Sequence, residues 1–347
     1  MPRISIHLAA WNSMRFLPDA LLSIEAQTCR DFQIIIVDNA STDGLADYLR
    51  ERWPEVVLLR NSRNLGFARA HNQAIDLAKS FWEKRVESGE RFVLITNPDI
   101  LLEPDCLERL LAAAEAHPGA GSIGPKLRRA KENTASEILE IIREEKIDSA
   151  GLKISRRGRI VERGAGETDR GEYNRGEEVF GISGALCLYR LSALDDAAEN
   201  GEYFDENFFS YKEDVDLAWR LRLLSWGAWY EPSAVAFHFR GAFGSEKRGL
   251  VRAFRERREK SRLVNRLSYR NHFWLMVKNL DFSAFLLYSY RLLPYEIAKL
   301  LFLLIFERGT LASLAEALGG AAAVWQKRRA LHARRRASAK EIRRWFK

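Results

Sequence analysis

QIIIVDNASTDG, residues Gln33–Gly44, is the stretch that decides the fold. Its first half is a continuous apolar run, which is typical of a β-strand buried on both faces. Its second half is a polar turn that carries two aspartates, Asp38 and Asp43. A buried strand that ends in such a turn indicates a parallel sheet with polar side chains at its carboxyl edge, where α/β sheets bind their ligands.

The segments around this stretch alternate between strand and helix patterns. The alternation predicts an α/β domain with a mainly parallel sheet flanked by helices. Asp38 and the Asn97-Pro98-Asp99 turn then fall at the carboxyl ends of strands. The strands are predicted at Ile4–Leu8, Gln33–Val37, Val56–Leu59 and Phe92–Thr96, and the helices at 16–27 and 65–81.

After about residue 126 the sequence predicts secondary structure less clearly. Residues 126–180 are polar, charged and rich in glycine, and we expect loops and short elements there. Further on, the pattern predicts a strand at 180–190, a helix at 207–226 and a short strand at 234–239.

Charge and cysteine content narrow the class of protein. The net charge of the 347 residues is +8, but residues 327–347 hold ten Lys and Arg against one acid, so the rest of the chain carries −1. Such a tail suits nucleic acid or an anionic membrane surface. Three separated cysteines without a CxxC pair and no visible signal peptide fit a reducing cytoplasm.

The segment Phe282–Phe306 is strongly apolar but contains Arg291, Glu296 and Lys299. A membrane-spanning helix needs about 20 nearly uncharged residues. We therefore expect a C-terminal helical extension that lies in a membrane interface, with the basic tail and the aromatic residues Trp325, Trp345 and Phe346 at the same surface. The alternative is that these helices pack as core or against a second subunit.

Acidic residues are the first candidates for chemistry. Asp38, Asp43 and Asp99 follow strand patterns and can hydrogen-bond a ribose or ligate a hard divalent cation, although aspartate also favours ordinary turns. Asp214 opens a helix pattern and is a candidate general base for an acceptor hydroxyl. The structural alternative is that acids complement the start of a helix, with Asp216–Arg220 as an ordinary i,i+4 pair.

Two further motifs carry polar groups. His238 ends a strand pattern, where a lone histidine is usually structural. The segment Asn64–Arg69 leads into a helix, and Gly66 permits close backbone approach to a phosphate. The usual glycine-rich dinucleotide and P-loop motifs are missing from the sequence.

Taken in order, these motifs resemble the family 2 glycosyltransferases of the GT-A fold, and among them bacterial rhamnosyltransferase-like enzymes. The resemblance spans about residues 4–241. It rests on the segments Val37–Gly44, Asn64–Asn72, Leu94–Asp99, Gly181–Ala185, Phe204–Arg220 and His238–Gly241.

The resemblance implies a role for each candidate residue. Asp214 would be the catalytic base, and Asp99 and His238 would hold a divalent metal, Mg²⁺ or Mn²⁺. Gly184, Glu213 and Arg220 would lie on the acceptor side. The donor nucleotide would contact Ala10, Asn12, Asp38, Asn39, Asp43, Asn64, Gly66, Arg69 and Asn97. Asn97 stands where the family has the first acid of its Asp-x-Asp element, and Trp11 stands where the family often has a tyrosine.

The resemblance also implies an organisation and an activity. Residues 1–265 would be a GT-A catalytic domain, with a nucleotide-sugar half at about 1–125 and an acceptor half at about 126–265, and 266–347 a helical region with the basic tail. The enzyme would move a sugar, by resemblance rhamnose, from a nucleotide-diphosphate-sugar to an acceptor hydroxyl with inversion, and the basic tail favours a glycan or lipid-linked acceptor. It would act in cell-surface polysaccharide synthesis, peripheral at the cytoplasmic face of the inner membrane.

Two other classes remain open. A nucleotidyltransferase would use a similar α/β site and a metal, but residues 8–16 have no glycine-rich basic phosphate loop. A non-enzymatic nucleic-acid-binding protein is supported by the tail alone. We therefore expect no nucleic-acid partner, while a homo-oligomer remains open.

Overall fold

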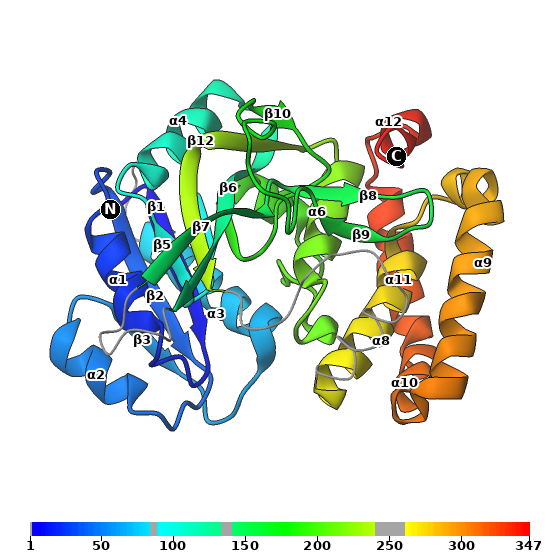
Figure 1. The fold of residues 1–347 in the computed structure, drawn as a ribbon, viewed down its shortest axis with the longest axis horizontal. Helices are drawn as coiled ribbons and strands as arrows, with labels where there is room; N and C mark the ends of the chain where they lie inside the picture. Colours follow the sequence, from blue (N-terminus) through cyan, green and yellow to red (C-terminus); the bar gives the residue numbers. More distant parts are fainter. Residues whose placement is uncertain (1, 84–88, 133–140, 240–260) are drawn as a thin grey trace.

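The computed structural model describes residues 2–83, 89–132, 141–239 and 261–347. A ten-stranded sheet forms its centre, and helices cover both faces (Figure 1). The sheet contains β1 (Ile4–Ala10), β2 (Phe32–Asp38), β3 (Val57–Arg60), β4 (Phe92–Thr96), β5 (Ile100–Leu102), β6 (Ala120–Glu132), β7 (Ile141–Ser149), β10 (Glu177–Glu178), β11 (Leu186–Arg190) and β12 (Gly227–Phe239). A separate hairpin pairs β8 (Leu152–Ile154) with β9 (Ile160–Glu162).

The N-terminal part of the sheet is parallel, as predicted. Its order is β4-β1-β2-β3, and the register aligns Ala10 with Asp38 at the carboxyl edge. The chain moves from β1 outward to β3 and then returns to β4 on the other side of β1, so a topological switch point lies beside β1. Ile34 and Ile36 face one core and Ile35 and Val37 the other, which confirms the strand buried on both faces.

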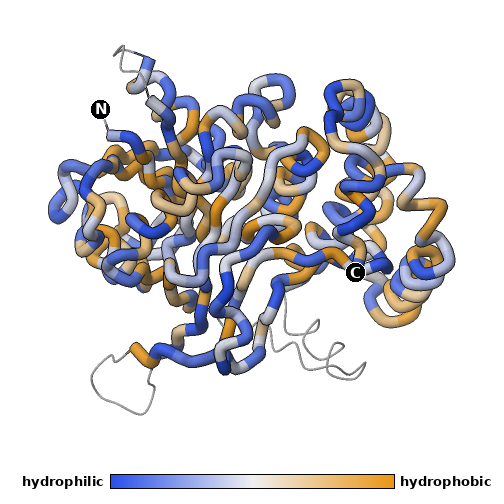
Figure 2. Tube along the Cα trace, turned by 90° about the horizontal axis from the view of Figure 1, so that it is seen from above, coloured by the Kyte–Doolittle hydropathy of each residue, from blue (hydrophilic) through white to orange (hydrophobic). Residues whose placement is uncertain are grey.

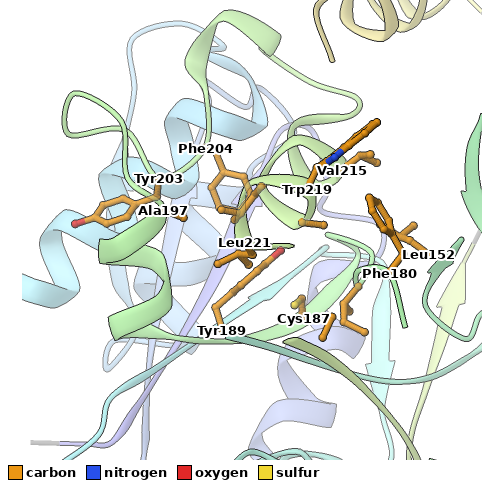
Figure 3. Close-up of a cluster of buried hydrophobic side chains, with 14 of the residues drawn as sticks. Leu152, Phe180, Cys187, Tyr189, Ala197, Tyr203, Phe204, Val215, Trp219 and Leu221 are labelled. Carbon is orange, nitrogen blue, oxygen red and sulfur yellow. The ribbon is translucent and has the colours of Figure 1, made fainter. Parts of the chain in front are cut away.

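Two layers of helices flank the sheet. α1 (Leu17–Glu25), α2 (Leu45–Arg52) and α4 (Cys106–Ala116) cover one face of the sheet. The other face is covered by α3 (Gly66–Glu83), α5 (Leu191–Ala197) and α6 (Glu213–Leu223). Figure 3 shows the core beneath α6, where Trp219 packs edge-on against Phe180 at 5.7 Å between ring centroids.

The second half of the chain differs from the prediction at several points. The region 126–180 contains the end of the long strand β6 and its antiparallel partner β7. The charged side chains in both strands hide the strand pattern in the sequence. The strand predicted at 180–190 begins only at Leu186. β12 covers 13 residues rather than the six predicted, with an irregularity in register between Glu231 and Val235.

The helix predicted at 207–226 is also shorter. A 3₁₀ turn, η1 (Glu206–Phe208), comes first, and α6 begins only at Glu213. Phe209, Tyr211 and Lys212 have φ angles of 64°, 72° and 72°, which no right-handed helix allows. We call residues 209–212 the left-handed loop; it leads directly into the start of α6, where Asp214 lies.

The C-terminal helices pack on the same core as the sheet and α6. They are α8 (Arg262–Asn279), α9 (Phe282–Phe306), η2 (Arg308–Thr310), α10 (Ala312–Gly319), α11 (Ala321–Ala333) and α12 (Ala339–Arg343). Leu275, Leu331 and Ile342 belong to the core cluster that contains Trp219. Buried Lys278 of α8 lies 2.9 Å from Asp205 and 3.0 Å from Asp216 of α6. α8 is therefore held to α6 by buried ion pairs.

The basic tail does not form the free cationic surface that its composition predicts. Lys327, Arg334, Arg335, Arg336 and Arg344 all form ion pairs with acids elsewhere in the chain. Those acids are Glu178, Asp196, Glu202, Asp205 and Asp281.

Two of the three aromatic residues expected at a membrane interface are also placed differently. Phe346 is buried, and Trp345 packs against Phe180 and the guanidinium of Arg222. Only Trp325 is exposed as expected. Half of the ten cations of the tail are therefore paired within the chain, and two of its three aromatic side chains pack against the protein; contact of the tail with a membrane stays a prediction.

α9 keeps an exposed apolar face along its whole length. Figure 2 shows hydrophobic stretches in the helices on the right-hand side of the molecule. None of the helices in the described ranges is both long enough and apolar enough to cross a bilayer. Ten large apolar side chains of α9 are exposed, and we call eight of them the α9 face: Phe282, Leu286, Tyr290, Leu293, Ile297, Leu301, Leu304 and Ile305.

Candidate active site

The turn after β2 is tied to the turn after β1. The Asn12 backbone N–H donates to Ser41 Oγ at 2.9 Å, and the Asn12 side-chain oxygen accepts from the Thr42 N–H at 2.9 Å. Asp43 accepts from the Met14 N–H at 2.8 Å. Ala10 joins the same cluster because its carbonyl accepts from the Asn39 N–H at 2.8 Å. These donor-side candidates therefore lie together at the switch point of the sheet.

Asp38 itself is not exposed to a ligand in this arrangement. Its carboxylate is fully buried, accepts from the Ser41 N–H at 2.8 Å and lies 3.2 Å from Nε of Arg60. The expected direct contact of Asp38 with a base or ribose stays a prediction. Through its hydrogen bond with the Ser41 N–H, Asp38 stabilises the conformation of the loop that contains Asn39 and Asp43.

The Asn64–Arg69 segment connects this loop to the opposite side of the site. Asn39 donates to the carbonyl of Gly66 at 3.3 Å, and Asn64 accepts from the Gly66 N–H at 2.8 Å. Gly66 has φ +83°, and a Cβ there would lie 2.4 Å from the Phe209 carbonyl oxygen. Glycine is required because the two loops touch through their backbones. Arg69 lies 3.5 Å from Glu206.

The metal candidates come together although 139 positions of sequence separate them. β5 and β12 pair antiparallel with Ile100 opposite His238, and the Phe239 N–H donates to the Asp99 carbonyl at 2.9 Å. This pairing places Nε2 of His238 3.4 Å from Oδ1 of Asp99. Arg240 and Gly241, the last residues of the family motif, lie outside the described residues.

Asp148 of β7 is the other partner of His238, and sequence reasoning missed it. Its carboxylate lies 2.8 Å from Nδ1 of His238. Burial alone would lower the pKa of His238, but the hydrogen bonds with Asp148 and Asp99 outweigh it and raise that pKa to about 9. A carboxylate on the far ring nitrogen is the usual support of a metal-binding histidine, because it fixes the ring and its tautomer.

This arrangement fits a divalent cation held jointly with a substrate. Two ligands at about 2.1 Å from one ion lie about 3 Å apart, close to the observed Asp99–His238 separation. Within the described ranges, no group of three His, Cys, Asp or Glu side chains could hold a metal alone. Mg²⁺-type sites commonly use one or two protein ligands and complete their coordination with substrate phosphates and water.

Asp214 sits at the start of α6 and is fixed by backbone donors. Its Oδ2 accepts from the Gly184 N–H at 2.8 Å and its Oδ1 from the Val215 N–H at 2.8 Å. A Cβ on Gly184 would lie 2.9 Å from Cβ of Asp214, so this close contact needs glycine. The neighbouring Ala185 carbonyl accepts from the Asn97 N–H at 2.9 Å. The base candidate and the Asn97–Asp99 turn are thus bridged by two consecutive residues.

Asn271 of α8 holds the left-handed loop in front of Asp214. Its side-chain nitrogen reaches the carbonyl oxygens of Phe208, Ser210 and Tyr211 at 2.8–2.9 Å, and the side chain is fully buried. Strained backbone of this kind persists only where surrounding groups fix it, and it is common at active sites. A polar residue in an otherwise mixed helix gives no sequence signal for this role.

Two of the acceptor-side candidates are placed differently from expectation. Arg220 is fully buried and donates to Asp216 at 2.8 Å and to the Tyr203 carbonyl at 2.6 Å, so it does not reach an acceptor. The ordinary i,i+4 pair was the correct alternative. Glu213 is buried, and burial together with the neighbouring Asp214 raises its pKa well above the usual range. Only Gly184 contacts the base directly.

A polar sheet edge with an Asp–His pair and a helix-borne aspartate, on a β-α sheet of this order, defines a GT-A-type glycosyltransferase. In the solved structure of GalNAc-T7 with UDP, GalNAc and Mn²⁺ the same fold covers 80% of this chain and 48% of that chain, with a TM-score of 0.54 and 13% identity. The family model for glycosyl transferase family 2 matches residues 5–197. The chain belongs to glycosyl transferase family 2.

Curated relatives agree with this family. The chain is 32% identical over 225 residues to the N-acetylglucosaminyl-diphospho-decaprenol L-rhamnosyltransferase of Mycobacterium tuberculosis, which covers 63% of this chain and 70% of the relative. It is 30% identical over 119 residues to a PGL/p-HBAD biosynthesis glycosyltransferase of Mycobacterium bovis, covering 33% of this chain and 43% of the relative. The chain is a glycosyltransferase, which decides among the three classes left open by the sequence.

Proposed function

We propose that this enzyme transfers a sugar from a nucleotide-diphosphate-sugar to a hydroxyl of a lipid-linked glycan, with inversion at the anomeric carbon. The name of the Mycobacterium tuberculosis relative supports a diphospho-lipid acceptor and L-rhamnose as the sugar. The donor would occupy the half formed by about residues 1–125, and the acceptor the half formed by about 126–265 and α8.

One observation carries the proposal. Gly184 and Ala185 are adjacent, and they hydrogen-bond to Asp214 and to the Asn97 backbone respectively. A proton acceptor and a diphosphate-side Asp–His pair are therefore held by one short backbone segment. A displacement reaction needs this arrangement, since positioning of both reactants supplies much of the rate.

The chemistry follows from the residues present. The acceptor hydroxyl attacks the anomeric carbon, its proton passes to an oxygen of Asp214, and the bond from that carbon to the diphosphate oxygen breaks. The nucleoside diphosphate leaves with the bonding electron pair. Asp99 and His238 would hold a divalent cation, Mg²⁺ or Mn²⁺, which supplies charge neutralisation for the leaving diphosphate. A single displacement from the opposite face inverts the anomeric carbon.

The test combines binding and turnover. Thermal shift with a panel of nucleotide sugars, with and without Mn²⁺, identifies the donor. The variant Asp214→Asn keeps the shape of the side chain but accepts no proton, so turnover should fall at least about a hundredfold while donor binding stays within about twofold. Near-normal turnover in Asp214→Asn, or activity unchanged by a metal chelator, would contradict the mechanism.

We also propose that the enzyme docks on the cytoplasmic membrane surface. The α9 face exposes eight large apolar side chains on one helix, and Phe282, Tyr290 and Ile305 are each more than half exposed. A lipid-linked acceptor makes such docking useful, because enzyme and acceptor then share one plane. Because half of the tail cations are paired with acids of the chain, we expect the α9 face to contribute more to membrane affinity than the net charge of the tail.

A further inference from the structure

A cavity of about 440 Å³ opens beside Asp214. Its walls come from the β8–β9 hairpin, the start of α6, and the helices α8 and α9. Three cationic side chains from three different elements line it: Arg159, Lys212 and Lys299. Lys212 belongs to the Phe204–Arg220 segment singled out in the sequence, whereas Arg159 and Lys299 lie outside every motif.

Two of these three cations lack a protein partner. In the described part of the chain, neither Arg159 nor Lys212 forms an ion pair, whereas Lys299 lies 3.6 Å from Glu296. Lys212 is only partly exposed. Burial lowers its pKa, the negative charge of Asp214 opposes that shift, and the charge of Arg159 adds to it. The acids in the wall are Asp214 and Glu162, and Glu162 accepts from the Ser149 hydroxyl. Neither Arg159 nor Lys212 is neutralised by an ion pair at contact distance, so an anion could bind between these two neighbouring cations.

An apolar groove adjoins the cationic cavity. This second cavity, of about 500 Å³, lies between α8 and α9 and shares Tyr269 and His272 with the first. Its wall is mostly apolar, with Phe273, Met276 and Leu292 among its side chains. His272 and Glu296 are paired with each other at 2.7 Å.

The junction of the two cavities is fixed by the β8–β9 turn. Gly158 has φ +71°, and a Cβ there would lie 2.7 Å from both Leu292 and Met276. The turn therefore packs against the groove and holds the next residue, Arg159, at its end. At the other side the groove is lined by Leu293 and Ile297, which also belong to the α9 face.

We propose that these two cavities form one acceptor site for a polyisoprenyl diphosphate, with the diphosphate at Arg159 and Lys212 and the first isoprene units in the groove between α8 and α9. The order along the protein matches the order along such a molecule: sugar hydroxyl at Asp214, then diphosphate, then hydrocarbon. The inference rests on the proposed function for the sugar transfer itself. A lipid reaching the groove from a membrane would enter across the α9 face.

The diphosphate end is tested by calorimetric titration of the full-length protein with farnesyl diphosphate, without any donor. Arg159→Gln removes one charge from an exposed side chain, so folding should be retained. Charge-assisted hydrogen bonds of this kind change affinity at least about tenfold. The matched control is Arg157→Gln, an exposed neighbour outside the cavity, which should bind farnesyl diphosphate like the wild type.

The hydrocarbon end is tested with a second pair of variants. Ile297→Glu places a charge at the groove from a position that is 56% exposed, and Leu263→Glu, also 56% exposed, changes α8 outside the groove. Farnesyl diphosphate should bind the wild type at least about tenfold more tightly than inorganic pyrophosphate. Ile297→Glu should abolish that advantage without changing pyrophosphate binding, and Leu263→Glu should keep it.

The outcomes separate this inference from the proposed function. Equal affinity for farnesyl diphosphate and pyrophosphate, or wild-type binding by both Arg159→Gln and Ile297→Glu, overturns the acceptor site. The expected binding pattern in a protein that turns over no nucleotide sugar supports the site and refutes the proposed transfer. Transfer to a lipid acceptor with an unchanged KM in both variants refutes the site alone.

Discussion

Replacing Lys278 by methionine should weaken the packing of α8 on α6 and lower the stability of the protein. The ammonium group of Lys278 is fully buried and lies 2.7 Å from Glu199, 2.9 Å from Asp205 and 3.0 Å from Asp216. Methionine keeps most of the length and volume of the side chain. The change therefore removes the charge and little packing, and its cost is chiefly electrostatic.

The three acids do not lose their partners equally. Asp216 keeps Arg220 at 2.8 Å, and Asp205 keeps Lys327 at 2.7 Å. Glu199 forms no second ion pair among the described residues, so it becomes a buried carboxylate without a contacting cation, with Arg220 as a more distant charge. Breaking a buried pair in this way costs about 3–5 kcal/mol, against a total stability of about 5–15 kcal/mol. We expect the melting temperature to fall by roughly 5–10 °C.

The loss should depend on pH in a defined direction. Burial would raise the pKa of Asp205, but Lys278 and Lys327 outweigh it and lower that pKa, so its contribution is present above about pH 4 and is lost on acidification. Burial would lower the pKa of Lys278, but the acids raise it, so its contribution is present below about pH 10 and is lost at higher pH. In the variant, an unpaired carboxyl takes up a proton as the pH falls. The difference from wild type should therefore be largest near neutrality and shrink toward pH 5.

The assay is urea unfolding followed by circular dichroism at pH 7 and pH 5. Lys340→Met is the matched control, because Lys340 is exposed on α12 and loses the same charge. An unfolding midpoint for Lys278→Met equal to that of Lys340→Met would refute the reasoning. A difference that grows toward pH 5 would refute the assignment of its cause.

Three further predictions concern the site and the membrane. Asp148→Asn should raise the Mn²⁺ concentration needed for half-maximal donor binding by about 10–100-fold, and an unchanged thermal-shift titration would show that the carboxylate does not support the metal side. Gly184→Ala should lower kcat at least about tenfold while donor binding persists, because the added Cβ would lie 2.9 Å from Asp214; equal kcat would mean that Asp214 need not be held there. The double variant Leu286→Glu/Leu301→Glu should stop the protein from floating with liposomes, and size-exclusion chromatography should show the same oligomeric state as wild type. Dissociation of a wild-type dimer by this variant would instead identify the α9 face as a subunit interface.

The parallel half of the sheet was accessible from sequence because each signal there is local. The apolar run at Gln33–Val37, the helix periods around it and the polar turn after it all lie within one short stretch, and burial of that run on both faces follows from its composition. Asp99 and His238 were named from the resemblance, but their contact at 3.4 Å depends on the β5–β12 pairing, which no local pattern encodes.

Other features depend on contacts that sequence patterns do not carry. Asp148 lies in a region whose alternating charges look like loop, yet β7 places it against His238. The positive φ angles before Asp214 occur at Phe209, Tyr211 and Lys212. None of these residue types favours a positive φ, so the sequence did not predict this loop. The excess charge of the tail was counted correctly, but the acids that pair with it come from distant elements.

These contacts make α8 part of the active site as well as part of the C-terminal region. Asn271 fixes the loop that leads into α6, and Asn279 and Lys278 hold Asp216, two positions after Asp214. A truncation that removes α8 would therefore displace Asp214, the proposed base, and remove the α9 face in the same step. Loss of membrane binding and loss of activity in such a truncation would have different causes that the experiment could not separate. Single-side-chain changes on the exposed face of α9 leave the α8 contacts intact, so they are the variants that distinguish membrane docking from the positioning of the base.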